Sequence, residues 1–162
     1  MTGRQTILGR TLRLARADVD ALVDRAEDPQ QTLDRLVRDY ADHIREAERA
    51  AATALGNLRL READHRRATG AADEWGAKAR AAGRRADELR AGGAAALAGT
   101  FDDLARTALE RQTTAESAAT AAEPLIAAQT EVVERLKQNL DAMREKLAAL
   151  DSRRDAARPG AA

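Results

Sequence analysis

The side chains that most often catalyse reactions or hold metals are scarce in this sequence. There is no cysteine, and the two histidines, His43 and His65, have no partner at metal-ligand spacing. The two serines, Ser117 and Ser152, do not lie in a nucleophile-elbow motif, and no phosphate-binding loop of the Gly-Lys-Ser/Thr type occurs. We therefore expect no catalytic activity, no metal site and no cofactor.

The chemistry that remains is electrostatic, and it is concentrated near the N-terminus. Lys+Arg balances Asp+Glu at 27 each over the whole chain, yet residues 1–17 contain four arginines and no acidic residue. Apolar residues recur there at steps of three and four, which predicts one amphipathic helix over about Arg4–Arg25. A basic amphipathic helix of this kind binds the surface of an anionic membrane. The candidate membrane-binding residues are Arg4, Ile7, Leu8, Arg10, Leu12, Arg13, Ala15, Arg16, Val19 and Leu22.

The same apolar face also suits packing against the rest of the chain or against a neighbouring copy. Both arrangements are compatible if the helix is docked in the free protein and inserted at a membrane. The sequence alone leaves these alternatives open.

Composition restricts the architecture that must carry this helix. The apolar residues are mainly alanine and leucine, with one Phe, one Tyr and one Trp, and a third of the chain is charged. Because alanine buries little area, a narrow seam between long helices suits this chain better than a wide core. The balanced charge argues against a nucleic-acid partner. No run of about 20 apolar residues occurs, and arginines interrupt the apolar stretch at the start, so we expect neither a membrane span nor a signal peptide and place the protein in the cytoplasm. Together with the basic amphipathic helix, this predicts a protein that is peripheral on the inner face of the plasma membrane.

A second helix should begin at the Asp28-Pro29-Gln30-Gln31 junction. Asp28 suits the N-cap, Pro29 suits the first helical position, and Gln31 suits the third. From here apolar residues alternate at steps of four and three, the heptad pattern of a left-handed coiled coil. The predicted hairpin seam comprises Leu33, Val37, Tyr40, Ile44, Leu58, Trp75, Leu104, Val133, Leu136, Leu140, Met143, Leu147 and Leu150.

Clustered glycines predict where the chain turns back. Gly83, Gly92, Gly93 and Gly99 lie close together, and Thr100 could cap a returning helix that Pro124 should kink or break. The fold class expected is all-α: a long antiparallel coiled-coil hairpin preceded by a short amphipathic helix. Its parts are a membrane-binding helix (1–27), a hairpin (28–158, with helices 28–90 and 101–158 and a glycine-rich tip 83–100) and a disordered tail (159–162).

Several segments in order resemble the phage shock protein A family of bacterial ESCRT-III-like proteins. They are Leu8-Gly9-Arg10, residues 15–22 (ARADVDAL), residues 25–29 (RAEDP), residues 36–40 (LVRDY), residues 44–47 (IREA), Glu74-Trp75, Lys78-Ala79 and residues 103–109 (DLARTAL). The resemblance covers most of residues 7–155. It identifies the chain as similar to a short form, because the family's C-terminal helices would begin where this sequence ends.

The resemblance implies a membrane-associated hairpin that assembles into homo-oligomers or polymers and protects or remodels the bacterial inner membrane under envelope stress. An alternative is a regulatory docking module, in which residues 30–60 bind and restrain a transcriptional activator or another stress-response protein. A plain structural spacer is a third class. A remodelling protein should form very large assemblies and deform vesicles, whereas a docking module should stay monomeric or dimeric.

Overall fold

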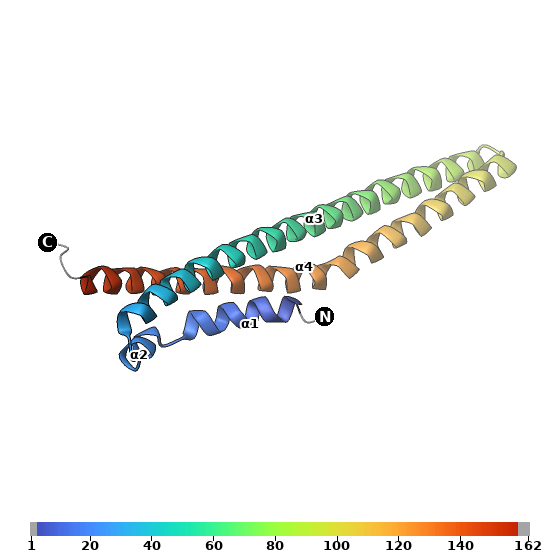
Figure 1. The fold of residues 1–162 in the computed structure, drawn as a ribbon. Coiled ribbons are helices and arrows are strands. Elements are labelled where there is room, and N and C mark those ends of the chain that lie inside the picture. The colour runs from blue at the N-terminus through green and yellow to red at the C-terminus, as the bar shows by residue number, and fades with distance from the viewer. Residues whose placement is uncertain (1–2, 159–162) are drawn as a thin grey trace. The chain divides into compact units, whose positions relative to one another are not determined.

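The fold consists of four helices in the computed structural model, which describes the backbone of residues 3–158 and the side chains of residues 7–158. They are α1 (Gly3–Arg16), α2 (Val19–Asp24), α3 (Pro29–Ala91) and α4 (Ala95–Ala157) (Figure 1). The long helices α3 and α4 pack against each other as an antiparallel hairpin, and the short helices precede it. The predicted all-α hairpin is confirmed. The predicted tail, residues 159–162, lies outside the described residues.

Helix α3 begins where the Asp-Pro-Gln-Gln sequence places it. The Asp28 carboxylate accepts a hydrogen bond from the Gln31 backbone N–H at 3.1 Å, and the Asp28 carbonyl accepts one from the Thr32 N–H at 3.1 Å. Pro29 is the first helical residue, where a missing N–H leaves no helical hydrogen bond unmade. Local side-chain chemistry therefore fixes this boundary.

The turn between α3 and α4 is much shorter than the predicted tip. The Ala94 N–H donates to the Leu89 carbonyl at 2.9 Å and the Gly93 N–H to the Arg90 carbonyl at 3.2 Å, the two bonds of a Schellman motif. Gly93 has φ = 83°, a left-handed conformation that glycine adopts without steric cost. The predicted tip over 83–100 and second helix from 101 are therefore wrong, because a single left-handed residue suffices to end α3 and the flanking alanines are helical.

The hairpin divides into two compact units, which we call the base unit (residues 1–56 and 129–162) and the tip unit (residues 57–128). The base unit contains a continuous core of large side chains from α2, α3 and α4. Leu147 packs against this core and is partly buried. The buried apolar residues of the base unit are Val19, Val23, Leu33, Val37, Tyr40, Ile44, Ala47, Ala54, Val133, Leu136, Leu140, Met143 and Leu150.

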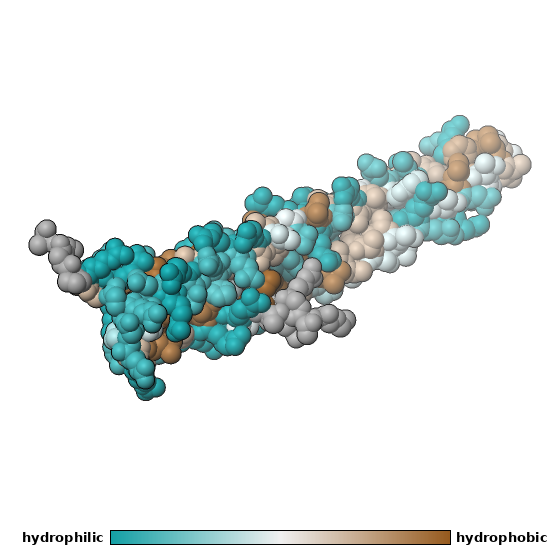
Figure 2. All heavy atoms as spheres, viewed as in Figure 1, coloured by the Kyte–Doolittle hydropathy of each residue, from teal (hydrophilic) through white to brown (hydrophobic). Residues whose placement is uncertain are grey.

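The tip unit has a seam of small residues. Its buried apolar side chains are Leu58, Ala72, Ala79, Ala86, Ala98 and Ala108. Gly76 also faces this seam, since a Cβ there would come within 3.1 Å of Gln112 Nε2. Figure 2 shows brown and pale patches among the teal surface toward the turn between α3 and α4, which indicates that hydrophobic residues also lie on the outside.

Two predicted seam residues in the tip unit are placed differently from expectation. Leu104 is 53% exposed, because the three- and four-residue repeat of α4 passes through the smaller Ala105 and Ala108. Trp75 is half-buried at the edge of the seam, with the Lys78 ammonium 4.4 Å and the Arg111 guanidinium 4.9 Å from the ring centroid. Assigning Leu104 to the seam was therefore wrong.

Helix α4 is continuous through Pro124, so of the kink or break predicted at that residue the break is wrong and the kink stays a prediction. Proline removes one main-chain hydrogen bond, and Pro124 lies on the exposed side of the helix.

Candidate functional site at the N-terminal helices

The basic N-terminal segment forms two helices, and the expected single helix over Arg4–Arg25 is wrong. The Tyr40 hydroxyl donates to the Leu14 carbonyl at 2.7 Å, which supplies a donor to the last turn of α1. The Asp18 carboxylate accepts from the Ala21 N–H at 3.0 Å and caps the start of α2. These two polar contacts favour ending one helix and starting another at Ala17-Asp18.

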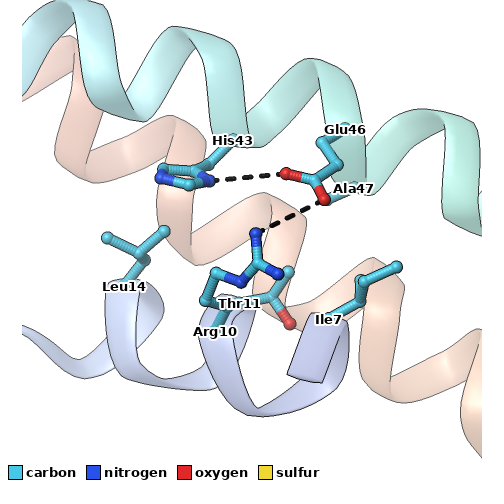
Figure 3. Close-up of a pocket in the computed structure, with 7 residues that line it drawn as sticks. All are labelled: Ile7, Arg10, Thr11, Leu14, His43, Glu46 and Ala47. Atoms are coloured by element: carbon cyan, nitrogen blue, oxygen red, sulfur yellow. Dashed lines mark ion pairs between the residues drawn. The ribbon is translucent and has the colours of Figure 1, made fainter. Parts of the chain in front are cut away.

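Helix α1 packs against α3 through one face (Figure 3). The side chains of Ile7 and Leu14 point toward α3, together with Arg10. The Arg10 guanidinium lies 3.5 Å from the Glu46 carboxylate, which is also 3.6 Å from Nδ1 of His43. Both Arg10 and Glu46 are about two-fifths exposed, so this ion pair adds orientation more than stability.

The same helix is attached to α4 through a hydrogen bond at its most buried residue. Thr11 is 4% exposed, and its hydroxyl accepts from the Asn139 side-chain amide at 3.0 Å while donating to the Leu8 carbonyl at 3.0 Å. We call the contacts Thr11–Asn139, Leu14–Tyr40 and Arg10–Glu46 the α1 clasp. Two helices of the hairpin therefore hold α1 in place through polar groups.

Helix α2 is held more firmly. Val19 and Val23 are buried in the base-unit core. The Arg153 guanidinium pairs with Asp24 at 2.5 Å and with Asp20 at 2.9 Å. Hydrogen bonds to Asp24 and then Asp20 raise the pKa of Arg153. The burial of two valines and the ion pair with two carboxylates therefore hold α2, a helix of only six residues, against the rest of the base unit.

The opposite side of α1 remains open. Leu12 is 39% exposed, and the neighbouring Arg13 and Arg16 are exposed and make no ion pair within the described part of the chain. Both arginines lie in the last turn of α1, where positive charge suits the helix dipole. A groove between α1 and α4 is lined by Leu8, Gly9, Leu12, Ala15, Arg16, Arg135, Gln138, Asn139 and Ala142.

The predicted membrane-binding residues are thus divided between the two sides of the N-terminal helices. Leu12, Arg13, Arg16 and Leu22 are exposed, whereas Val19 is buried. The half-buried residues are Ile7, Leu8, Arg10 and Ala15. The side chain of Arg4 lies outside the described residues.

Sequence reasoning did not identify the polar partners of these helices. Glu46, Asn139 and Arg153 come from distant parts of the chain, and Tyr40 was assigned only to the seam. Asn139 directly precedes the seam residue Leu140 and follows the polar residues Lys137 and Gln138, so it lies at the edge of the apolar stripe. Its partner, however, is 128 positions away and could not be read from spacing.

The fold and the site together define a helical hairpin that carries a basic amphipathic helix on its base unit. No helix in the described part of the chain is long and apolar enough to cross a membrane. The chain belongs to the PspA/IM30 family, which matches residues 6–158.

Similar proteins carry names that refer to membranes or to phage shock. The chain is 27% identical over 152 residues to the chloroplastic membrane-associated protein VIPP1 of Oryza sativa, covering 94% of this chain and 44% of that protein. It is 28% identical over 149 residues to the phage shock protein A homolog of Deinococcus radiodurans, covering 92% and 60%. It is 26% identical to the membrane-associated protein Vipp1 of Synechocystis, covering 92% and 51%. The chain spans about half the length of these relatives.

Proposed function

We propose that this protein binds the anionic inner face of the bacterial plasma membrane through α1, self-associates through its hairpin, and protects or remodels that membrane under envelope stress. The observation that carries the proposal is the open side of α1. There an exposed leucine, Leu12, is flanked by Arg13 and Arg16, and neither guanidinium has an acidic partner within the described residues.

Charge separation along the N-terminal helices supports this orientation. Residues 1–17 carry only basic charge, and the first acidic residues are Asp18 and Asp20 at the start of α2. A helix that lies in the interface buries its apolar side and directs arginines to lipid phosphates. The acidic start of α2 disfavours insertion beyond α1, so the membrane contact should be confined to α1.

Exposed leucines on the hairpin support self-association. Leu97, Leu104 and Leu125 are each at least half exposed, and they are separated by 7 and 21 residues along α4. Multiples of seven place residues on one side of a coiled-coil helix. A second copy would cover such a stripe and remove it from water.

Sedimentation with vesicles tests the membrane contact. The intact chain should pellet with vesicles containing phosphatidylglycerol, should not pellet with pure phosphatidylcholine, and should lose binding at high salt. The variant R13E/R16E should weaken binding by more than roughly tenfold, since each arginine near an anionic leaflet contributes about 1 kcal/mol. The matched control is R66E/R84E, which reverses two exposed arginines of the tip unit that also make no ion pair within the described residues.

The control should bind as the unaltered chain does, because its charge change is the same but lies outside α1. Equal losses in both variants would indicate a general charge effect and would contradict a specific role for α1. Failure of the intact chain to bind anionic vesicles would reject the membrane proposal. Self-association is tested separately, by the mass of the assemblies in solution and on vesicles, with Leu104→Lys expected to reduce it.

A further inference from the structure

The side of α1 that an interfacial helix needs is partly occupied by the hairpin. Ile7, Leu8 and Ala15 are half-buried against the base unit, although they belong to the apolar stripe predicted to enter a membrane. Arg10 faces the Glu46 carboxylate. The same side chains cannot contact α3 or α4 and a bilayer at once, so docking and full insertion exclude each other.

The α1 clasp consists of contacts that are weak individually and easily replaced at a membrane surface. The ion pair of Arg10 and Glu46 is solvent-accessible, with 3.5 Å between charged atoms. Two of its hydrogen bonds involve a buried side chain: the 3.0 Å bond between Thr11 and Asn139, and the 2.7 Å bond from the Tyr40 hydroxyl to the Leu14 carbonyl. Lipid phosphates offer Arg10 an alternative partner, and the lipid interface offers the apolar stripe an alternative place to be buried.

The break at Ala17-Asp18 separates this exchangeable helix from a firmly held one. Val23 is 1% exposed, and Arg153 holds both Asp20 and Asp24. In α1, by contrast, Thr11 is the only buried residue among the described side chains. Because α1 is less buried than α2, α1 can detach from the hairpin while α2 stays packed in the base-unit core.

From these observations we propose that the α1 clasp is an autoinhibitory contact that keeps the membrane-binding helix docked on α3 and α4 until an anionic lipid surface replaces Asn139, Tyr40 and Glu46 as its partners. This inference rests on the proposed membrane function. In this mechanism α1 turns away at Ala17-Asp18 while α2 remains attached through Val19 and Val23, which are buried in the base-unit core. The apparent affinity for vesicles is then lowered by the fraction of chains in which α1 is docked.

A first variant weakens the clasp without altering α1. Asn139→Ala removes the donor to Thr11 from α4, and it should raise the apparent affinity for anionic vesicles roughly two- to tenfold, the range given by the loss of one hydrogen bond. The matched control is Asn57→Ala, a half-buried asparagine of the tip unit, which should leave binding unchanged. Hydrogen exchange of the α1 amides should become faster in the Asn139 variant and not in the control.

A second variant closes the clasp covalently. Because the chain contains no cysteine, the variant R10C/E46C carries thiols only at these two accessible positions, which can be joined by a short bismaleimide. The joined form should lose vesicle binding relative to the same variant capped with N-ethylmaleimide. The capped form has the same substitutions and lacks only the tether, so their difference reports release of α1.

The outcomes separate this inference from the function on which it rests. Stronger binding by the Asn139 variant and weaker binding by the joined form would support the clasp. If the intact chain binds through Arg13 and Arg16 but the joined and capped forms bind equally, the clasp proposal is wrong and the membrane proposal stands. If the intact chain does not bind anionic vesicles, the membrane proposal is rejected, and the clasp inference that rests on it is rejected as well.

Discussion

The base unit and the tip unit contain parts of the same two long helices, yet the side chains that they bury differ in size. In the base unit the seam is filled mainly by leucine, valine, isoleucine, methionine and tyrosine, with alanine only at Ala47 and Ala54, whereas in the tip unit every buried apolar residue except Leu58 is alanine. The exposed leucines follow the reverse distribution. The tip unit exposes Leu60, Leu97, Leu104, Leu109 and Leu125, and the base unit exposes Leu12 and Leu22.

A heptad repeat therefore determines which face of each helix is buried, but not how much free energy that burial contributes. Burial contributes about 25 cal/mol per Å² of apolar surface, so a leucine seam stabilises the hairpin far more per residue than an alanine seam. Alanine and glycine instead permit close approach, as where the missing Cβ of Gly76 leaves room for Gln112. Large buried side chains therefore stabilise the base unit, whereas small side chains let the two helices of the tip unit approach each other closely.

The base unit also contains most of the long-range polar contacts. The Arg144 guanidinium reaches Glu48 across the hairpin at 3.0 Å, and the Gln129 amide donates to the Ala54 carbonyl at 3.1 Å. In the tip unit most ion pairs join residues three apart on one helix, such as Arg106 with Asp103. Pairs of that kind stabilise a single helix by a few tenths of a kcal/mol and do little to join two helices.

The largest expected effect comes from removing bulk in the base unit. Leu140→Ala should lower the free energy of unfolding by about 2–5 kcal/mol, because Leu140 is 4% exposed and its loss leaves a cavity. The control is Leu109→Ala, the same substitution at a 53% exposed leucine of α4, which should change stability by less than about 0.5 kcal/mol. Urea unfolding followed by circular dichroism measures both. Equal losses would show that the two leucines are buried alike and would remove the basis of the comparison.

The reverse substitution should have its effect in the tip unit. Ala108→Leu places a large side chain in the alanine seam and should destabilise the tip unit by about 1–3 kcal/mol, because the helices must separate to admit it. Ala121→Leu, on the exposed side of the same helix, is the control and should be nearly neutral. Hydrogen exchange of tip-unit peptides is the measurement, since global unfolding reports mainly on the base unit. A stabilising Ala108 variant would mean that the seam is underpacked rather than close-packed.

A smaller effect is expected at the turn that ends the alanine seam. Gly93→Ala should cost roughly 1–2 kcal/mol, since a Cβ is strained at φ = 83°. The neighbouring Gly92 lies in the same turn without a left-handed φ, and a Cβ there would meet only the Glu88 and Leu89 carbonyls at 3.6 and 3.7 Å. Gly92→Ala should therefore be neutral. Thermal unfolding of the two variants tests this contrast, and equal losses would locate the strain elsewhere in the turn.

These cases also show what the sequence could and could not predict. The start of α3 and the leucine seam depend on local capping and on periodicity, so Asp28 and the Val133–Leu150 repeat were sufficient to predict them. The glycine cluster located the turn only approximately, because counting glycines does not show which one adopts a positive φ. Leu104 is exposed although it is large and apolar, because small residues such as Ala108 form the seam of the tip unit, and no local pattern shows that choice.

The N-terminal site was predicted in character but not in geometry. Its basic charge and apolar stripe are evident from residues 4–22. The break between α1 and α2 depends on Tyr40, which lies 26 residues from its partner Leu14, and the clasp depends on Asn139 from the far end of the chain. Contacts of this range are decided by the folded hairpin, which no local pattern encodes.

The smallest expected effect concerns the one tyrosine, which belongs to the base unit and donates to α1. Tyr40→Phe removes the hydrogen bond to the Leu14 carbonyl and should cost about 0.5–1.5 kcal/mol. Burial also raises the pKa of Tyr40, so the folded chain keeps the phenol proton to higher pH than the unfolded chain does. The part of the folding stability that depends on a neutral phenol is therefore fully present below the ordinary pKa of about 10. It is lost as the pH rises through the raised pKa of Tyr40.

Tyrosinate absorbance measures this pKa directly, because the sequence contains a single tyrosine. The midpoint should lie above that of the same chain in urea, and identical midpoints would mean that the phenol is not buried. If α1 contributes to that burial, Asn139→Ala should bring the midpoint back toward the ordinary value, whereas Ala108→Leu in the tip unit should leave it unchanged. A shift caused by the tip-unit variant would indicate that the two units do not respond independently, and the base unit's stability would then depend on the alanine seam as well.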